Sequence, residues 1–580
     1  MRALLDFLLF DWLKAETLCA RPRHAGQSRE DYAQMLDACE RVAREVWQSA
    51  NRACDTDEPK VDADGKVQLP ASTARAVRAY FDTGLHTAGL DAEHGGLQLP
   101  CMVEMAGNAF FSKASPGCMG YPMLSVANTG LLLAHGTPAQ IEAFARPQIE
   151  GRWLGTMCLS EPAIGSSLGD LTTRAEADGG DALGARYRLK GSKMWISAGE
   201  HELAENIVHL VLAKVPREDG SLPEGSAGIS LFIVPKFRPD GTRNGVSLVG
   251  LNHKLGWRGT SNCLLNFGES DAALGWRVGA EGQGLAQMFH MMNEARIGVG
   301  LGAAMLAMAG YEVSRAYAAE RVQGRAPGRR GGPQQPLNAH ADVRRMLLQQ
   351  KAVAEGALAL NLFCARLVDE QRSSGPDAEQ AAQLLALLIP VAKSWPSQWG
   401  LEANSQAIQV LGGAGYTRDW PVEQFWRDQR LNMIHEGTHG IQGLDLLLRK
   451  ASQPALVQAF AQRVNATVQA ALAEPDLAEW ANQLAGALAL VGKALKSAWA
   501  SGDPAQAALH ATPVLQGFGH LVLAWIWLDL HVAARGHALE PGLRAACAYF
   551  FAYELPLVQA WLQPVLAQQR LLAEVDEAAL

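Results

Sequence analysis

Residues 434–442 read Ile-His-Glu-Gly-Thr-His-Gly-Ile-Gln, and the interpretation of the whole chain starts from this stretch. Glu436 lies between a largely apolar approach, residues 431–434, and a Gly-Thr turn. Apolar surroundings raise the pKa of a carboxyl group and make it a usable base near neutral pH. Glu436 is therefore a candidate catalytic base, although an ordinary charged residue at the start of a helix would give the same short pattern.

The composition around this stretch is typical of a folded protein with several domains. The chain has 580 residues, which is too long for a single hydrophobic core and predicts three or four domains or subdomains. Hydrophobic residues make up 48% and charged residues 19%, which excludes a disordered or collagen-like chain. The net charge of −8 argues against a nucleic-acid partner, because such proteins usually present a basic face.

The cysteines and the apolar runs indicate where the protein resides. Nine cysteines are scattered without a CxxC pair, so we expect no disulfide framework, no metal site and a reducing compartment. Asp6 and Asp11 interrupt the apolar run at residues 4–13, and no small-residue cleavage site follows closely, which favours an amphipathic helix over a signal peptide. The apolar run at residues 521–528 is too short to cross a bilayer. We therefore expect a cytoplasmic protein with no transmembrane segment.

The hydrophobic pattern divides the chain into five segments. Residues 1–35 predict an N-terminal helical strap, and residues 36–152 an N-terminal helical domain. Residues 153–278 contain short β-rich runs separated by Asp-Gly turns, which predict an antiparallel β-barrel or sandwich. Residues 279–450 predict a second helical bundle, and the Ala/Leu/Gln-rich residues 451–580 an additional C-terminal helical domain. Because strands and helices do not alternate, the pattern indicates an α+β fold and disfavours a doubly wound sheet.

Three further segments carry residue types that suit a planar ligand. Residues 157–167 combine hydroxyls with small residues and could wrap a polar heterocycle or form an ordinary capped turn. Trp195 and Ser197 are two residues apart, which places them on one face of a strand beside a flat ring, unless the indole is a core residue. Residues 409–416 end a helix in a glycine-rich turn, which either lets the backbone approach a ligand or simply caps the helix.

A fourth glycine-containing segment, residues 298–302, reads Gly-Val-Gly-Leu-Gly and partly matches a dinucleotide-binding fingerprint. That fingerprint must follow a strand and open a helix. These glycines lie inside a helical run with no strand before them, so we expect them to allow close packing between helices.

In order and spacing, these segments together resemble the acyl-CoA dehydrogenase family over roughly residues 75–450. Residues 340–348 and the long C-terminal extension resemble the large-subunit branch that includes 3-methylmercaptopropionyl-CoA dehydrogenases. The resemblance implies FAD as the cofactor. In this family FAD is shared across subunits, so at least a homodimer is expected.

The resemblance also assigns residues to ligands. Residues implied in FAD binding come from all the motif segments: Met157, Leu159, Ser160, Ser166, Trp195, Ser197, Arg321, Gln323, Gln409, Gly412, Gly413, Thr438 and Gln442. Residues implied in acyl-CoA binding are Ser166, Asn293, Arg296, Glu436 and Gly437. Two positions depart from the family pattern, because Asn293 replaces an aspartate and His435 replaces a tyrosine that commonly precedes the base.

The activity implied by the resemblance is α,β-dehydrogenation of an acyl-CoA thioester. Glu436 would remove the pro-R α-proton while a β-hydride passes to flavin N5, and the product is a trans-2-enoyl-CoA. The backbone N–H of Glu436 and a ribityl hydroxyl of FAD would stabilise the charge on the thioester oxygen, like an oxyanion hole. Electron-transferring flavoprotein would then accept the electrons, and the acyl-chain specificity stays open.

The alternatives keep the fold and change the role. Related flavoproteins are oxidases, monooxygenases or DNA-damage-associated proteins, and a non-catalytic scaffold is also conceivable. Glu436 argues against an oxidase, which usually has Asp there, and the near balance of charge in residues 451–580 argues against DNA binding. The set of Glu436, Trp195 and Arg321 disfavours a scaffold.

Overall fold

The structure is a computed structural model that describes residues 1–329 and 331–580, without the side chains of residues 290–293. The chain is a helix-rich α+β protein that divides into two compact units, each treated separately below. The helical unit comprises residues 1–33, 100–109 and 296–580, and the sheet unit comprises residues 34–99 and 110–295.

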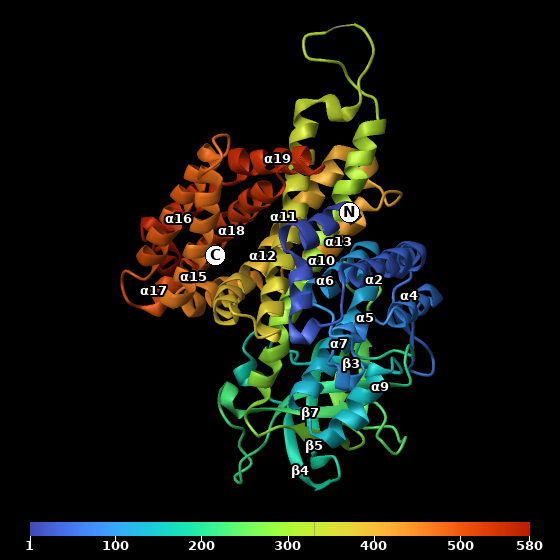
Figure 1. Ribbon diagram of the computed structural model, residues 1–580. Coiled ribbons are helices and arrows are strands. Elements are labelled where there is room, and N and C mark those ends of the chain that lie inside the picture. The colour runs from blue at the N-terminus through green and yellow to red at the C-terminus, as the bar shows by residue number, and fades with distance from the viewer. Residues whose placement is uncertain (330) are drawn as a thin grey trace. The chain divides into compact units, whose positions relative to one another are not determined.

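Helices of the sheet unit pack around buried aromatic rings. They include α3 (Gln48–Thr56), α4 (Ala71–Asp82), α7 (Pro116–His135) and α9 (Arg146–Ile149). Trp47, just before α3, is fully buried; its indole N–H donates to the carbonyl of Ala76, and its ring meets Phe111 edge-on at 5.0 Å. Both α7 and α9 contact the first strand of the large sheet (Figure 1).

The large sheet has eight strands. They are β3 (Trp153–Cys158), β4 (Arg174–Asp181), β5 (Gly184–Ser197), β6 (Asn206–Lys214), β7 (Ile229–Pro235), β8 (Val246–Leu251), β9 (Asn262–Phe267) and β10 (Ala273–Val278). Their order is β10-β7-β6-β4-β5-β9-β8, with β3 beside β6 and an additional pairing of β10 with β5. Every residue of β6 and β7 is buried, which matches their continuous hydrophobic runs.

The prediction of an antiparallel barrel requires correction. β3 pairs with β6 in parallel along its whole length, from Trp153 opposite Asn206 to Cys158 opposite Val211. β4 also pairs with β6 in parallel, at Arg174. The sheet folds back where β10 meets β5, but β8 pairs only with β9 and remains an edge strand, so the sheet is mixed and is not a closed barrel.

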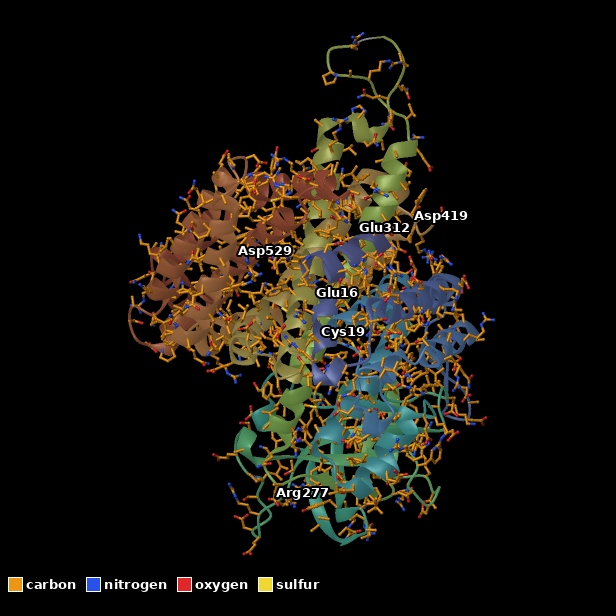
Figure 2. The ribbon with its side chains drawn as sticks, viewed as in Figure 1. Glu16, Cys19, Arg277, Glu312, Asp419 and Asp529 are labelled. Atoms are coloured by element: carbon orange, nitrogen blue, oxygen red, sulfur yellow. The ribbon has the colours of Figure 1, made fainter. Side chains whose placement is uncertain are left out.

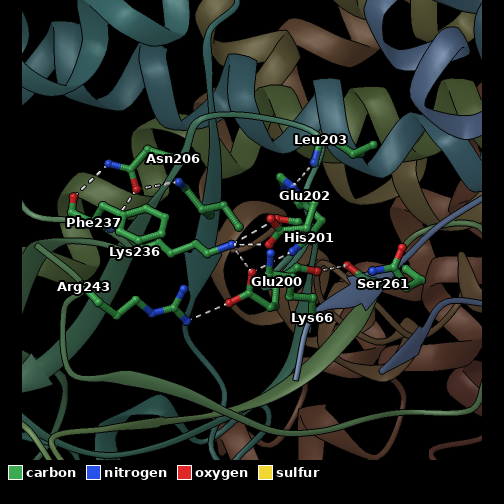
Figure 3. Close-up of polar contacts among 12 residues, drawn as sticks. Lys66, Glu200, His201, Glu202, Leu203, Asn206, Lys236, Phe237, Arg243 and Ser261 are labelled. Atoms are coloured by element: carbon green, nitrogen blue, oxygen red, sulfur yellow. Dashed lines mark hydrogen bonds and ion pairs between the residues drawn. The ribbon is translucent and has the colours of Figure 1, made fainter. Parts of the chain in front are cut away.

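A cluster of charges around the buried pair Lys236 and Glu200 fixes the chain that follows β5. The Lys236 ammonium lies 2.5 Å from Glu200 Oε1 and 2.9 Å from Glu202 Oε1 (Figure 3). Arg243 lies 3.1 Å from Oε2 of Glu200. The Ser261 hydroxyl donates to the backbone carbonyl of Glu200 at 3.0 Å. These contacts tie the end of β5 to β7 and to the segment before β9.

Three long helices and two short ones carry the base-containing stretch in the helical unit. They are α10 (Gly284–Glu320, from Arg296 onward), α11 (Ala341–Arg372), α12 (Ala378–Leu411), α13 (Val422–Leu431) and α14 (His439–Leu444). A Cβ on Gly300 would lie 1.9 Å from the carbonyl oxygen of Ala392, so only glycine permits this contact between α10 and α12. Pro396 cannot donate a hydrogen bond to that carbonyl, which leaves it free to meet Gly300. The expected helix packing of the glycine segment is confirmed at this residue.

The C-terminal extension is a helical bundle with one helix at its centre. Its main helices are α15 (Pro454–Leu472), α16 (Ala478–Ala498), α18 (Ala511–Ala533), α19 (Glu540–Tyr549) and α20 (Leu557–Leu566), coloured orange to red in Figure 1. α18 contacts the other four and also α11 and α12. The N-terminal segment packs here as its amphipathic pattern predicts, because Trp12 donates to Asp529 Oδ2 on α18 at 2.8 Å (Asp529 is labelled in Figure 2).

Two described helices, α10 and α18, are long and apolar enough to cross a membrane. α18 includes the apolar run at residues 521–528 and is longer than that run alone indicated. In each, 83% of the most apolar window is buried within the protein, as in core helices of soluble proteins. The absence of a transmembrane segment therefore stays a prediction.

Candidate active site

Glu436 lies in the loop between α13 and α14 with an unusual backbone conformation. Its φ is 53° and that of Gly437 is 92°, so two consecutive residues are in the left-handed region. This conformation costs a non-glycine residue roughly 1–2 kcal/mol. At Gly437 a Cβ would also lie 2.5 Å from Gln442 Nε2. The loop therefore needs glycine after the carboxylate, and Glu436 is held against its own backbone preference.

Hydrogen bonds from three sides hold this loop. Lys393 on α12 donates from Nζ to the carbonyl of Gly437 at 2.6 Å. Gln442 on α14 donates from Nε2 to the carbonyl of Glu436 at 3.2 Å. The Thr438 hydroxyl caps α14 by accepting from the backbone N–H of Ile441. The predicted site residues Glu436, Thr438 and Gln442 thus form one connected group.

The charges around the loop act on the carboxylate in opposite directions. Glu436 is partly buried, and burial raises the pKa of its carboxyl group, whereas the positive charges of Arg296 and Lys393 oppose that rise. Burial lowers the pKa of Lys393 to about 7, against the attraction of Glu436. A carboxyl group with a raised pKa next to a lysine that titrates near neutrality is the electrostatic pattern of an acid–base site.

Arg296 lies in the same neighbourhood. Its Nη1 is 3.2 Å from Asp445 Oδ2, both side chains are buried, and its Nε has no hydrogen-bond partner among the described residues. The side chain of the second predicted CoA contact, Asn293, lies outside the described residues.

In the sheet unit, a buried ion pair organises the segment around Ser160. Lys193 Nζ lies 3.1 Å from Glu161 Oε1 and donates to the carbonyl of Leu159 at 2.9 Å. Next to it, the backbone N–H of Met194 donates to the carbonyl of Ser160. The predicted residues Leu159 and Ser160 are therefore bound directly to the start of the Trp195 segment.

Trp195 is exposed on a strained turn of the backbone. Its φ is 64° and its side chain is 59% exposed, which excludes the core-residue alternative. The register between β5 and β9 shifts between Lys193 and Ile196, so a bulge interrupts the simple alternation assumed from the sequence. Ser197 follows, and its hydroxyl accepts from Asn262 Nδ2 at 3.1 Å.

The remaining predicted residues differ in their burial. In the sheet unit, Met157 packs against the hydrophobic core and Ser166 is exposed in the loop after it. In the helical unit, five residues assigned to FAD are all exposed: Arg321, Gln323, Gln409, Gly412 and Gly413.

The sequence did not predict the residues that hold the Glu436 loop and the segment around Ser160 and Trp195. Lys193, Glu161 and Lys393 are not among the site residues that the sequence predicted. A single lysine inside the apolar run at residues 385–395 was the available signal, because a buried lysine needs a partner.

Family models match most of the chain beyond the N-terminal helices. The model described as acyl-CoA dehydrogenase, middle domain, matches residues 156–269, and the acyl-CoA dehydrogenase C-terminal domain matches residues 282–450. The model described as acetyl-CoA dehydrogenase C-terminal like matches residues 460–576.

Individual proteins agree with these matches. The 3-methylmercaptopropionyl-CoA dehydrogenase of Ruegeria pomeroyi is 34% identical, covering 86% of this chain and 84% of its own length. ACDH-11 of Caenorhabditis elegans, solved with C11-CoA, has a TM-score of 0.78 at 21% identity, covering 97% of this chain and 94% of its own. An acyl-CoA dehydrogenase of Bacillus anthracis, solved with FAD, has a TM-score of 0.73 at 20% identity, covering 96% and 90%. The structural likeness shows the fold, and the sequence matches show that the chain belongs to the acyl-CoA dehydrogenase family.

Proposed function

We propose that this protein catalyses the FAD-dependent α,β-dehydrogenation of an acyl-CoA thioester to a trans-2-enoyl-CoA. The observation that carries the proposal is Glu436, a carboxylate with a raised pKa held in a strained left-handed conformation. Strain of this kind persists where the surroundings impose it, and it clusters at functional sites.

The side chains around Trp195 suit the flat, polar ring system of FAD. In the sheet unit, the exposed indole of Trp195 offers a flat face at the end of a strand, and Ser160 and Ser197 offer hydroxyls. An outward tryptophan at positive φ is costly for a protein unless a ligand uses it. When bound, FAD supplies the two-electron acceptor of the reaction, and the protein supplies position and charge.

The chemistry of the polypeptide itself centres on the α-proton of the thioester. This proton is too weakly acidic for a free carboxylate, so the site must stabilise the enolate as the carboxylate of Glu436 takes the proton. The backbone N–H of Glu436 would donate to the thioester oxygen. The positive charges of Arg296 and Lys393 oppose the rise that burial causes in the pKa of Glu436, and they therefore favour the ionised form that acts as the base.

The exposed FAD-assigned residues of the helical unit support a homodimer. Arg321 and Gln323 follow α10, and Gln409, Gly412 and Gly413 end α12, all at the surface. We propose that they contact the FAD of a second copy of the chain. Gln442 and Thr438 would serve the adenosine side of the cofactor.

Electron-transferring flavoprotein remains our proposed electron acceptor, and the cytoplasm our proposed location. The location rests on nine cysteines that are unpaired, eight of them buried. The five-segment division of the chain is likewise proposed, and the positions of the family models support the last three of its segments.

Anaerobic titration of the purified protein tests the function. A yellow protein whose visible flavin absorbance falls on addition of an acyl-CoA supports the proposal. The panel should contain short, long, branched, aryl and methylthio acyl-CoAs, because the acyl specificity is open. Retention of FAD with no bleaching by any member would refute the proposal.

A further inference from the structure

The C-terminal extension lies directly against α14, the helix that follows the loop containing Glu436 (the base loop). A Cβ on Gly443 of α14 would lie 2.9 Å from the carbonyl oxygen of Ala511, the first residue of α18. α14 and α18 are therefore in close contact within the helical unit. Glycine at this position lets the extension reach the loop that carries Glu436.

One side chain of α18 connects this extension to two elements of the site. Gln516 Nε2 lies 2.5 Å from Gln398 Oε1 on α12 and 3.3 Å from His439 Nε2 at the start of α14. An amide NH₂ group has two protons, and one is directed to each neighbour. In this arrangement His439 Nε2 accepts, and the ring proton belongs on Nδ1, which has no hydrogen-bond partner among the described residues.

The charge state of His439 agrees with this assignment. Burial and the positive charge of Lys393 lower the pKa of His439 to about 4. The imidazole is therefore neutral near pH 7 and free to accept from Gln516. A protonated ring would donate from both nitrogens and could not.

Holding His439 also holds the loop that contains the base. The backbone N–H of His439 donates to the carbonyl of Met433 at 3.1 Å, which closes the loop around Glu436. One turn along α18 from Gln516, His520 Nδ1 accepts from the indole N–H of Trp395 at 3.1 Å. Trp395 is two residues from Lys393, so α18 is tied to both elements that fix the loop.

We infer that Gln516 is a positioning residue for Glu436, and that the C-terminal extension acts on the reaction through the link from Gln516 to His439. The inference rests on the proposed function. A base held in a left-handed conformation needs fixed anchors on both sides. Lys393 fixes the carbonyl of Gly437, and Gln516 fixes the residue two positions further on.

The test compares Gln516→Leu with His439→Ala, with the double variant and with a matched control, Gln458→Leu. Gln458 is an exposed glutamine on α15 of the same extension. The measurements are the limiting rate of flavin reduction by acyl-CoA, the dissociation constant of that acyl-CoA, and hydrogen exchange of the peptide spanning residues 432–442. Thermal unfolding shows that each variant is folded.

We expect Gln516→Leu to lower the reduction rate about ten-fold, because small misplacements of a reacting group are costly. The acyl-CoA dissociation constant should stay within about two-fold, since ground-state binding is not lost. The double variant should be no slower than His439→Ala, because both remove one link. Gln516→Glu keeps the size of the side chain, but a carboxylate only accepts and cannot donate to Gln398 Oε1 or His439 Nε2, so it should slow reduction as the leucine variant does; it also serves if the leucine variant misfolds.

A wild-type rate in Gln516→Leu, or rate losses that multiply in the double variant, would overturn the inference. Hydrogen exchange separates this failure from failure of the proposed function. If no acyl-CoA reduces the wild-type flavin, the function is wrong. Faster exchange of residues 432–442 in Gln516→Leu, and not in Gln458→Leu, would still establish the anchoring, whereas unchanged exchange would refute it.

Discussion

Lys393 Nζ donates a 2.6 Å hydrogen bond to the carbonyl oxygen of Gly437, the residue that follows Glu436. The lysine thus fixes the backbone of the base loop and places a positive charge near the carboxylate. The two roles explain why an otherwise apolar stretch of α12 contains a fully buried lysine. Burying a lysine is costly, so its retention at this position points to the reaction.

Lys393→Met should slow flavin reduction and move its pH dependence. The charge of Lys393 lowers the pKa of Glu436, so its loss raises that pKa further. The base is then protonated up to a higher pH, and the acid limb of the reduction-rate profile should move upward. We also expect the rate at the plateau to fall about ten-fold from the lost anchor. Lys493→Met, at an exposed lysine on α16, is the control; a profile identical to wild type in Lys393→Met would refute this role.

Gly437→Ala should lower both stability and activity, whereas Gly440→Ala should do neither. Gly437 has a φ of 92°, and a Cβ there would meet Gln442, which predicts a loss of at least about 1–2 kcal/mol in the free energy of unfolding. Gly440 is helical, and a Cβ there meets no atom within 4 Å. Urea unfolding and flavin reduction measure the two effects. Equal behaviour of the two variants would show that the loop conformation is unimportant.

The Lys193–Glu161 pair should make stability depend on pH in the acid range. Burial alone would raise the pKa of Glu161, but Lys193 and the two threonine hydroxyls that donate to it lower that pKa to about 2, below its ordinary 4.5. The carboxylate therefore contributes stability above pH 4.5 that is lost as the pH falls toward 2. The double variant Glu161→Gln/Lys193→Met should lose stability less steeply over this interval.

The single variant Lys193→Met provides the matching comparison. It leaves Glu161 buried without its cation, which typically costs about 3–5 kcal/mol. It should therefore be less stable at neutral pH than the double variant, as measured by urea unfolding. The opposite order would show that the pair does not hold the Ser160 segment.

Trp195→Ala should weaken FAD binding with little effect on folding. The side chain is 59% exposed, so the free energy of unfolding of the FAD-free protein should change by no more than about 0.5 kcal/mol. Stacking of an aromatic ring on a flat heterocycle is worth about 1–3 kcal/mol, which predicts a dissociation constant for FAD raised about ten-fold or more. Tyr553→Ala, at a side chain 58% exposed in the C-terminal extension, is the control. Unchanged FAD affinity in Trp195→Ala would remove this residue from the cofactor site.

Local features of the fold could be predicted from the sequence, and its long-range pairings could not. The helical run around Gly300 and the packing role of that glycine follow from periodicity and from the missing strand. The parallel pairing of β3 with β6 does not, because hydrophobic alternation identifies strands and says nothing of their partners. The antiparallel expectation failed for this reason.

The same limit applies to the site. Glu436 could be predicted as a candidate base because its motif is contiguous, and the glycine after it matches the backbone conformation. The Lys193–Glu161 contact spans 32 residues and the Gln516–His439 contact spans 77, and nothing local in either segment indicates its partner. Trp195 could be predicted to stack on a flat ring from its spacing to Ser197, but the bulge beside it depends on the register with β9.

The central claim is that Glu436 is the base, and Glu436→Gln tests it most directly. Glutamine keeps the size of the side chain and removes its ability to take a proton. Anaerobic addition of an acyl-CoA that bleaches the wild-type flavin should leave the absorbance of Glu436→Gln unchanged, although the variant retains FAD. Full bleaching of Glu436→Gln at the wild-type rate would contradict the account.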